Sequence, residues 1–408
     1  RVFNMSFINK NAIFTVCNVA YLNKVMVLAE SLHKHSNVKI EVFVFDRKRR
    51  VEFDSKHCNL HWVEELDIPQ FKSLSFKYTV VELTTAFKPW LALSLLEKSA
   101  KVIFLDPDVM AFNSLDSIFR SLDEYPVILT PHYFSPKING LIDDEQIMRF
   151  GSYNLGFFAV DSSQKSKNFL NWWSDRCFSN AFDDPQFGIF TDQKWVSIAP
   201  IFFPFIHISY NPGLNVAFWN LDERTISTDI DKNYLVNDEY NMLFLHFSAF
   251  DEKYPEKLSK RSFRIGGNAC EMIAELGLIY SEQLKRYINI SDDMDYSFDY
   301  MSDGKYISPS LRRAYAANIE NFSVNDDPFD SRSQVAEFAK RNSLFQKANT
   351  RYTVQGYSSI DSHTIKFKVV YYFMRLVLRI IGANNFMSFS RLLVYLSRYH
   401  KNRDMWKY

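Results

Sequence analysis

The stretch KVIFLDPDVMAFNSL, residues 101–115, joins an apolar run to two aspartates that a single proline separates. Its first residues have the composition of a strand that is buried on both faces, as in the middle of a parallel sheet. An unpaired carboxylate is costly there, so we expect Asp106 and Asp108 at the mouth of the strand or beside a cation. A plain turn is the alternative, since aspartate and proline are both common in turns. Two carboxylates one residue apart can also hold a divalent cation through oxygen.

Strand and helix patterns alternate on the amino-terminal side of this stretch. Apolar residues predict strands over 13–16 and 39–46, and helices over 25–32 and 84–99. This order predicts an α/β fold with a mainly parallel sheet flanked by helices. Ligands of such sheets bind at the carboxyl ends of the strands. Four polar side chains fall at predicted strand ends: Asn18, Asp46, Asp106 and Asp108.

Residues up to about 255 continue the α/β pattern, with predicted strands over 126–132 and 151–161. After about residue 255 the strand pattern ends. Residues 256–290 have a helical pattern, whereas 291–362 are polar and weakly periodic, as in a loop-rich linker with one helix near 334–347. We therefore expect three parts: an α/β domain at 1–255, a helical and loop-rich extension at 256–362, and a basic amphipathic helical tail at 363–408.

The composition is that of a globular protein, with 408 residues of which 47% are hydrophobic. Its 48 basic and 47 acidic side chains give no reason to expect a nucleic-acid partner. The scattered cysteines, without a zinc-like spacing, favour a reducing compartment. Because the chain begins with Arg1, we expect it to be part of a longer protein. The cysteines are Cys17, Cys58, Cys177 and Cys270.

Basic residues are concentrated in the tail. Residues 365–408 contain nine Lys or Arg and one acid, Asp404. Lys368, Arg375 and Arg379 are spaced to share one helix face beside an apolar face. The arginines interrupt the apolar run, so the helix is not expected to span a bilayer. A basic amphipathic helix pair predicts binding to an anionic membrane surface. The alternative is that the pair packs on the domain at 1–255, or on another domain or subunit of the full-length protein.

Several short segments around the aspartate pair resemble nucleotide-sugar glycosyltransferases of the GT-A fold. LDPD matches the DxD motif of that fold, and FTVCNVAYLNKVMVLAESLHKH resembles its opening strand and helix. YNLGFFAVD, TDQKW and LFLHFSAFD resemble three later blocks of the retaining family 8 enzymes. The resemblance covers residues 11–255, and beyond it DGKYISPSLRRAYA and NDDPFD are similar to bacterial cell-surface polysaccharide glycosyltransferases.

The resemblance implies a role for each matching residue. The implied metal ligands, for Mn²⁺ or Mg²⁺, are Asp106, Asp108 and His246. The implied contacts to the nucleotide-sugar are Asn18, Tyr21, Asp46, Asp106, Asn154 and Gly156. The implied catalytic residues are Asp192, Gln193 and Lys88, of which Lys88 faces the donor. The family 8 lysine that ends the last block is absent, and Lys253 or Lys257 is expected to replace it.

These features predict metal-dependent transfer of a hexose from a nucleotide-sugar, expected to be a UDP-sugar, with retention of configuration. The expected acceptor is a growing saccharide or a lipid-linked glycan of a bacterial surface polysaccharide such as lipopolysaccharide O-antigen, at the cytoplasmic face of the inner membrane. A catalytically inactive GT-A module for binding or assembly is one alternative. A nucleotidyltransferase is another, although such enzymes usually carry a glycine-rich phosphate loop and TVCNVAYLNK has no glycine. Trp172, Trp173 and Trp219 are expected in the core rather than as sugar platforms.

Overall fold

The computed structural model describes residues 11–51, 56–139, 142–261, 269–287, 295–345 and 365–406. Its contacts divide the chain into two compact units. Unit 1 comprises Arg1–Phe71 and Val80–Ser297, and unit 2 comprises Lys72–Thr79 and Phe298–Tyr408. This division differs from the boundaries expected after residues 255 and 362. Helix α10 (Ala269–Lys285) falls in unit 1, together with the residues before 255.

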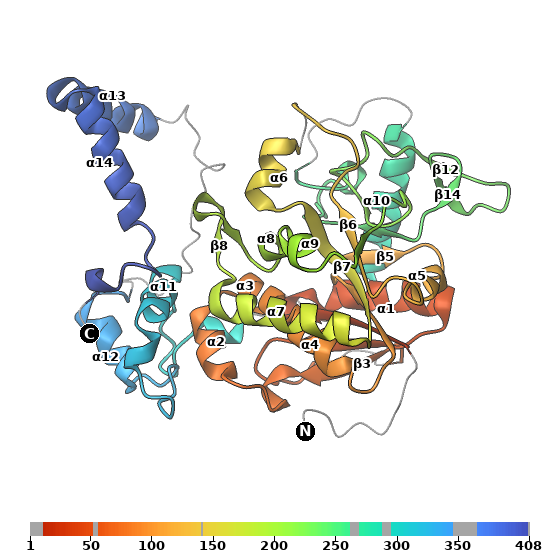
Figure 1. Ribbon diagram of the computed structural model, residues 1–408, viewed down its shortest axis with the longest axis horizontal. Coiled ribbons are helices and arrows are strands. Elements are labelled where there is room, and N and C mark those ends of the chain that lie inside the picture. Colours follow the sequence, from red (N-terminus) through yellow and green to blue (C-terminus); the bar gives the residue numbers. More distant parts are fainter. Residues whose placement is uncertain are drawn as a thin grey trace. The chain divides into compact units, whose positions relative to one another are not determined.

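A seven-stranded sheet forms the centre of unit 1. Figure 1 shows helices such as α1 (Leu22–Ser36), α4 (Lys88–Leu95) and α7 (Gln164–Asn180) packed around it. Its strand order is β10-β6-β7-β4-β1-β2-β3. Four of the six pairings are parallel, and only β7 runs antiparallel to both of its neighbours. The predicted α/β fold with a mainly parallel sheet is therefore confirmed. In chain order the strands are β1 (Asn11–Cys17), β2 (Ile40–Val44), β3 (Cys58–Trp62), β4 (Lys101–Leu105), β6 (Val127–Pro131), β7 (Tyr153–Asp161) and β10 (Ile206–Ile208).

Side chains alternate between the two faces of this sheet, as they must along a strand. Ile13 belongs to an aliphatic core that the sheet shares with α1 (Leu22–Ser36). Its neighbour Phe14 points the other way, and its ring lies 5.0 Å from that of Phe104 and 6.2 Å from that of Phe158. Trp173 of α7 (Gln164–Asn180) packs against Phe158 on this aromatic face, so its predicted core position is confirmed.

The helix predicted over 84–99 is two helices, α3 (Val80–Ala86) and α4 (Lys88–Leu95). Pro89 lies in the first turn of α4, where its missing N–H costs nothing and its fixed φ favours a helix start. The break places Lys88 at the beginning of α4. Between β4 and residue 255, unit 1 also contains α5 (Asp116–Ser121), α6 (Asp144–Phe150), α8 (Gln193–Val196) and α9 (Ala199–Phe202).

A smaller sheet continues the chain beyond the aspartate pair. β5 (Val109–Ala111) pairs antiparallel with β15 (Phe244–His246), which pairs in parallel with β11 (Val216–Ala217). This sheet joins two segments of unit 1 that are far apart in the sequence. Two hairpin-like sheets complete the unit: β12 (Ile226–Thr228), β13 (Tyr234–Val236) and β14 (Tyr240–Asn241), and β8 (Asp183–Asp184) with β9 (Ile189–Phe190).

Unit 2 has an aromatic core of its own. Phe76 of α2 (Phe71–Lys77) contacts the rings of Tyr315 and Phe329 at 4.8 and 5.2 Å. Tyr315 lies on α11 (Pro309–Ala317), and Phe338, on α12 (Gln334–Arg341), is also buried. The described residues 298–345 thus pack around a core, where the sequence predicted a loop-rich linker with one helix near 334–347. The part of that predicted linker at 346–362 lies outside the described residues.

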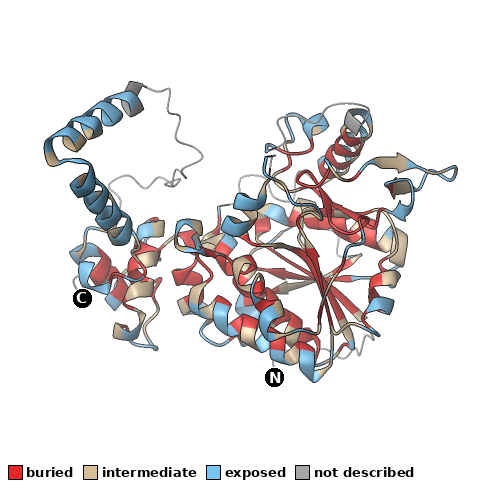
Figure 2. Cartoon of the chain, turned by 45° about the horizontal axis from the view of Figure 1, so that its top comes forward, coloured by how far each residue is buried: buried red, intermediate tan, exposed pale blue. Residues whose placement is uncertain are grey.

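The helical tail is confirmed as two helices, α13 (Ile365–Ile381) and α14 (Ala383–Leu396). Gly382 separates them with φ +80°, a conformation that favours glycine. Figure 2 shows that buried residues gather in the central strands, whereas exposed residues follow both tail helices. Among the helices that the structure describes, none is long and apolar enough to cross a membrane.

Candidate functional site

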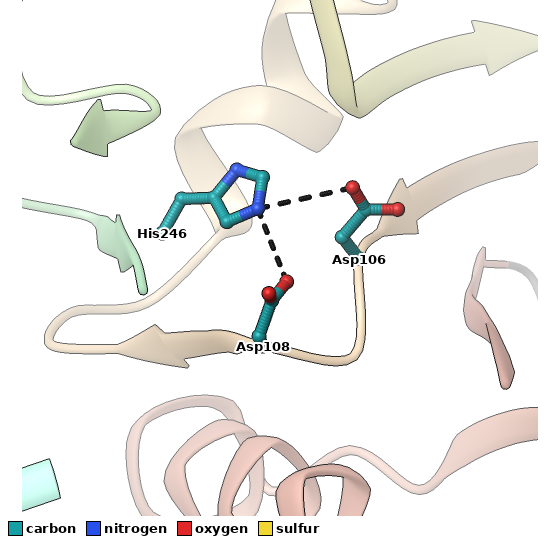
Figure 3. A group of neighbouring side chains, drawn as sticks. All are labelled: Asp106, Asp108 and His246. Atoms are coloured by element: carbon teal, nitrogen blue, oxygen red, sulfur yellow. Dashed lines mark ion pairs between the residues drawn. The ribbon is translucent and has the colours of Figure 1, made fainter. Parts of the chain in front are cut away.

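Asp106, Asp108 and His246 converge at the carboxyl end of β4, as Figure 3 shows. Asp106 follows the last residue of β4, and Asp108 comes directly before β5. The antiparallel pairing of β5 with β15 sets His246 opposite Val109. Nε2 of His246 lies 3.1 Å from Oδ1 of Asp108 and 3.8 Å from Oδ2 of Asp106. One ligand atom from each residue lies within 4.8 Å of the others.

The donor set of this cluster fits a divalent cation. Carboxylate oxygens suit Mg²⁺ or Mn²⁺, and an imidazole nitrogen shifts the preference toward Mn²⁺. Burial alone would raise the pKa of Asp108, but the adjacent His246 outweighs it and lowers that pKa to about 2. Burial likewise opposes the charged form of His246, yet Asp108 and Asp106 raise its pKa above the usual value. The ligand atoms of the three side chains thus lie close enough together to share one ion.

Gly156 on β7 makes room for the His246 ring. A Cβ at this position would lie 2.4 Å from Cε1 and 2.6 Å from Nδ1 of His246, which is closer than carbon contacts allow. The Gly156 carbonyl also accepts a hydrogen bond of 2.9 Å from the backbone N–H of Asp106. This residue therefore shapes the site through its backbone and its lack of a side chain. The contact to the nucleotide-sugar that the resemblance implies for it stays a prediction.

Lys88 is buried between two carboxylates. Its Nζ lies 3.1 Å from Oδ1 of Asp106 and 3.4 Å from Oδ2 of Asp192, and it donates to the carbonyl of Leu155 at 2.9 Å. The residue is 3% exposed. Burial opposes its charge, but the two carboxylates hold the pKa of Lys88 above its usual value. The predicted donor-facing lysine is thus a charged link between Asp106 and Asp192.

Asp192 and Gln193 lie at the start of α8, beside β7. Asp192 is 2% exposed and its side chain does not cap the helix. Burial raises the pKa of Asp192, which Lys88 partly offsets. Gln193 donates from Nε2 to the carbonyl of Phe150 at 3.0 Å, and its Oε1 accepts from the backbone N–H of Leu155 at 3.4 Å. Their predicted place beside an anomeric carbon stays a prediction.

Asn154 belongs to a buried polar network that the sequence did not reveal. Its Oδ1 accepts hydrogen bonds from the Gly156 N–H at 3.0 Å and from Nδ2 of Asn215 at 3.1 Å. Its Nδ2 faces Nε2 of His132 at 3.4 Å. Burial lowers the pKa of His132 to about 4, so the ring is neutral and can donate from Nδ1 to the Ser152 carbonyl. The network fixes the Asn154 side chain on β7, two residues before Gly156.

The segment around β11 supplies further residues near the site. Asn220 donates from Nδ2 to the carbonyls of His132 and Asn215, both at 3.1 Å. Trp219 lies edge-on between the rings of His132 and His246, with centroids 5.6 and 5.3 Å away. Its predicted core position is confirmed. These residues lie in irregular segments, where neither helical nor strand periodicity marks a buried side chain.

The residues predicted to contact the base and ribose lie after β1 and β2. The carbonyl of Asn18 accepts from the backbone N–H of Tyr21 at 3.1 Å, and Tyr21 is partly exposed. Asp46 is buried, and its Oδ1 accepts from Nη2 of Arg49 and from the backbone N–H of Ser297. The Asp46 carboxylate is therefore already occupied by groups of the chain. The nucleotide contacts of all three stay predictions.

Comparisons with known proteins identify the family of this chain. A sequence model of the nucleotide-diphospho-sugar transferase family matches residues 38–258, more than half of the chain. The uncharacterized protein YfnD of Bacillus subtilis (strain 168) is 24% identical over 302 residues, which cover 71% of this chain and 93% of YfnD. YfnF of the same organism is 26% identical over 156 residues, covering 37% of this chain and 50% of YfnF.

A solved structure of the galactosyltransferase LgtC, in complex with donor and acceptor sugar analogues, has a TM-score of 0.42 and 15% identity. The alignment covers 67% of this chain and 95% of LgtC. This structural likeness is too weak to assign an activity. The assignment of the chain depends instead on the family match, which extends from β2 to β15. The chain belongs to the nucleotide-diphospho-sugar transferase family.

Proposed function

We propose that this enzyme transfers a hexose from a UDP-sugar to a growing saccharide or lipid-linked glycan, with a divalent cation held by Asp106, Asp108 and His246. The observation that carries the proposal is the approach of these three side chains to within 4.8 Å at the carboxyl end of β4. A cation bound there, Mn²⁺ in the first place, would stabilise the negative charge that the diphosphate gains as the sugar leaves. The acceptor class we propose is a bacterial cell-surface polysaccharide such as O-antigen.

The chain's own residues would orient the carboxylates and the sugar. Lys88 contacts Asp106 and Asp192 and so restrains both side chains. Asp192 and Gln193 would lie beside the anomeric carbon, whose oxocarbenium character an amide or carboxylate can stabilise. Transfer would retain the α configuration of the donor. Retention is supported by the resemblance of TDQKW to family 8 enzymes.

The proposed location is the cytoplasmic face of the inner membrane, with α13 and α14 on an anionic surface. The exposed apolar side chains of α13 and its basic residues support this placement, because such helices bind in the membrane interface. A lipid-linked acceptor would lie at the same surface. The flotation experiment described at the end of the Discussion tests this part of the proposal.

The function is tested by incubating the purified protein with UDP- and GDP-hexoses, saccharide acceptors and Mn²⁺, and by determining the product linkage by NMR. We expect a glycoside product with α linkage and release of the nucleoside diphosphate. Asp108→Asn should lower turnover by at least about 100-fold, since it removes charge from the proposed ion site. Chelation with EDTA should have a comparable effect on the parent enzyme.

Asp116→Asn is the matched control, because it removes the same charge from an exposed residue of α5 outside the site. It should keep parental activity. Full turnover in EDTA or in Asp108→Asn would exclude the metal-dependent reaction. A β-linked product would exclude retention, and pyrophosphate release would instead indicate a nucleotidyltransferase. Binding of the nucleotide-sugar without any product would favour the inactive binding module.

A further inference from the structure

Helix α10 (Ala269–Lys285) supports the candidate metal site from outside the segment that matches the family. Gly277 of α10 lies directly on the turn at Pro255–Lys257, since a Cβ there would lie 2.0 Å from the Pro255 carbonyl oxygen. Tyr280 follows three residues later, on the same side of the helix. Both residues therefore face the segment that connects β15 to this turn.

The ring of Tyr280 stacks on that of Phe247, with centroids 3.8 Å apart and planes at 8°. Tyr280 is fully buried, and Phe250 closes its edge at 4.9 Å. Phe247 directly follows His246, and its backbone N–H donates to the carbonyl of Asp108 at 2.8 Å. The stack thus holds the short piece of backbone that joins two of the three candidate ligands.

The hydroxyl of Tyr280 is buried and has no hydrogen-bond partner among the residues that the structure describes. Leaving a buried hydroxyl unpaired costs about 1–3 kcal/mol, so such a group is expected to have a use. Burial raises the pKa of Tyr280 well above its usual value, and the nearby carboxylates of Asp108 and Glu252 raise it further. The group is therefore a neutral donor, carried by a ring that stacks on Phe247, whose own backbone N–H donates to the Asp108 carbonyl.

We propose that Tyr280 is a positioning residue of the metal site, whose ring fixes His246 through Phe247 and whose hydroxyl donates to Asp108 when a cation is bound. Carboxylates that bind metals commonly accept a hydrogen bond from a second layer of residues, which fixes their orientation. This inference rests on the proposed metal-dependent function. It adds a residue of α10 to a site that is otherwise built from β4, β5 and β15.

The test measures Mn²⁺ affinity of the purified full chain, without donor or acceptor, by electron paramagnetic resonance of the unbound ion. Tyr280→Phe keeps the stack and removes only the hydroxyl. We expect its Mn²⁺ dissociation constant to rise by about 10-fold, in the range that loss of such supporting contacts produces. Saturating Mn²⁺ should restore most of the parental kcat, which a general loss of folding would not allow.

Tyr280→Leu removes the stack as well, and we expect a larger rise of the dissociation constant than in Tyr280→Phe. Tyr315→Phe is the matched control, because it removes a buried hydroxyl from the core of unit 2. It should leave Mn²⁺ binding unchanged. If the variant Tyr280→Leu fails to fold, Tyr280→Phe still decides the question.

Asp108→Asn separates the two proposals. If the parent binds Mn²⁺, Asp108→Asn does not, and Tyr280→Phe binds as tightly as the parent, the role of Tyr280 is wrong and the metal site stands. If the parent does not bind Mn²⁺, or Asp108→Asn binds equally well, the metal site itself is wrong and the inference falls with it.

Discussion

Acidic and basic side chains alternate through the site, in the order Asp192, Lys88, Asp106, His246, Asp108. Neighbouring groups in this order lie 3.1–3.8 Å apart. Buried charges are tolerated only when they are paired, and removing one member leaves its neighbours uncompensated. Neutral substitution of Lys88 would therefore disturb Asp106 and Asp192 together, and the predicted role of Lys88 toward the donor stays a prediction.

His132 makes the stability of unit 1 depend on pH. Burial lowers its folded pKa to about 4 from an ordinary value of 6.5. Above pH 6.5 the His132 ring is neutral in both the folded and the unfolded chain, so it does not change the free energy of unfolding. As the pH drops from 6.5 toward 4, that free energy falls, because the unfolded chain binds a proton that the folded chain does not. Between pH 7.5 and pH 5 this histidine should cost about 2 kcal/mol of unfolding free energy.

The measurement is urea denaturation of the parent and of His132→Gln at pH 7.5 and pH 5. The variant loses hydrogen bonds and should be less stable at pH 7.5. Its deficit should shrink by about 2 kcal/mol at pH 5, since it has no imidazole to protonate. Parallel changes in the two proteins would contradict the assignment, because all other titrating groups are common to both.

The sequence predicted the cluster of Asp106, Asp108 and His246, but not the residues that pack around it. Carboxylates at the end of an apolar strand are a physical anomaly, and the order of the surrounding blocks added a family resemblance. Asn215 and Tyr280 carry no such signal, because an asparagine in a loop or a tyrosine in an amphipathic helix is an ordinary residue. Their importance comes from contacts between distant segments, which one sequence does not display.

Among the elements, strands buried on both faces were predicted most reliably, since continuous apolar runs such as those of β1, β2 and β4 leave little choice of structure. The division between α3 and α4 was missed, although Pro89 is a known signal for a helix start. β5 and β15 are only three residues long. Strands so short lack a periodic pattern, so their pairing, which brings His246 to the aspartates, could not be predicted from periodicity.

The segment DGKYISPSLRRAYA is explained by the packing of unit 2. Ser308 caps α11 by accepting from the Leu311 N–H at 3.2 Å. Arg312 is buried, and its Nη1 donates to the carbonyls of Ser75, Phe76 and Tyr78 at 2.7–2.9 Å. Its Nη2 donates to the Phe298 carbonyl and pairs with Asp299 at 2.9 Å. The segment that resembles surface-polysaccharide enzymes therefore has a structural role in the described part of unit 2.

Arg312→Leu should destabilise unit 2 by about 3–5 kcal/mol, because it removes a buried ion pair to Asp299 together with the hydrogen bonds of the guanidinium to four backbone carbonyls. The measurement is chemical denaturation combined with limited proteolysis of residues 298–345. Arg332→Ala, at an exposed arginine of the same unit, is the control and should change stability by less than about 0.5 kcal/mol. The double variant Arg312→Leu with Asp299→Leu should recover part of the loss. Equal stability of Arg312→Leu and the parent would show that the buried pair is not needed.

At the scale of the whole molecule, charge and apolar surface are unevenly distributed. The chain has a net charge of +1, yet nine Lys or Arg and one acid fall in residues 365–408, so the remainder is acidic. In α13, Phe373, Leu376 and Ile380 are 62%, 54% and 74% exposed, which is unusual for large apolar side chains. Arg375 and Arg379 lie beside this exposed face.

This combination favours an anionic membrane over a second protein surface. Apolar side chains of an interfacial helix enter the acyl region while neighbouring basic residues meet the lipid headgroups. Each basic residue near such a surface contributes about 1 kcal/mol, so the tail could bind reversibly without a lipid anchor. An apolar protein partner would account for the exposed face of α13 but would not need the surplus of basic residues.

Liposome flotation of the full chain decides between these occupants. We expect the parent to float with vesicles that contain phosphatidylglycerol, to remain below with neutral phosphatidylcholine vesicles, and to be released at high salt, because screening weakens the attraction. Phe373→Glu combined with Leu376→Glu should abolish flotation, since two carboxylates would have to enter the acyl region. Val324→Glu combined with Ile230→Glu is the matched control, because both residues are exposed outside the tail and the net charge changes equally. If both double variants float, or if neither the variants nor the parent float, the tail helices would instead be assigned to a protein contact. A rise of the parent's mass with concentration that Phe373→Glu with Leu376→Glu removes would identify a second copy of the chain as that contact.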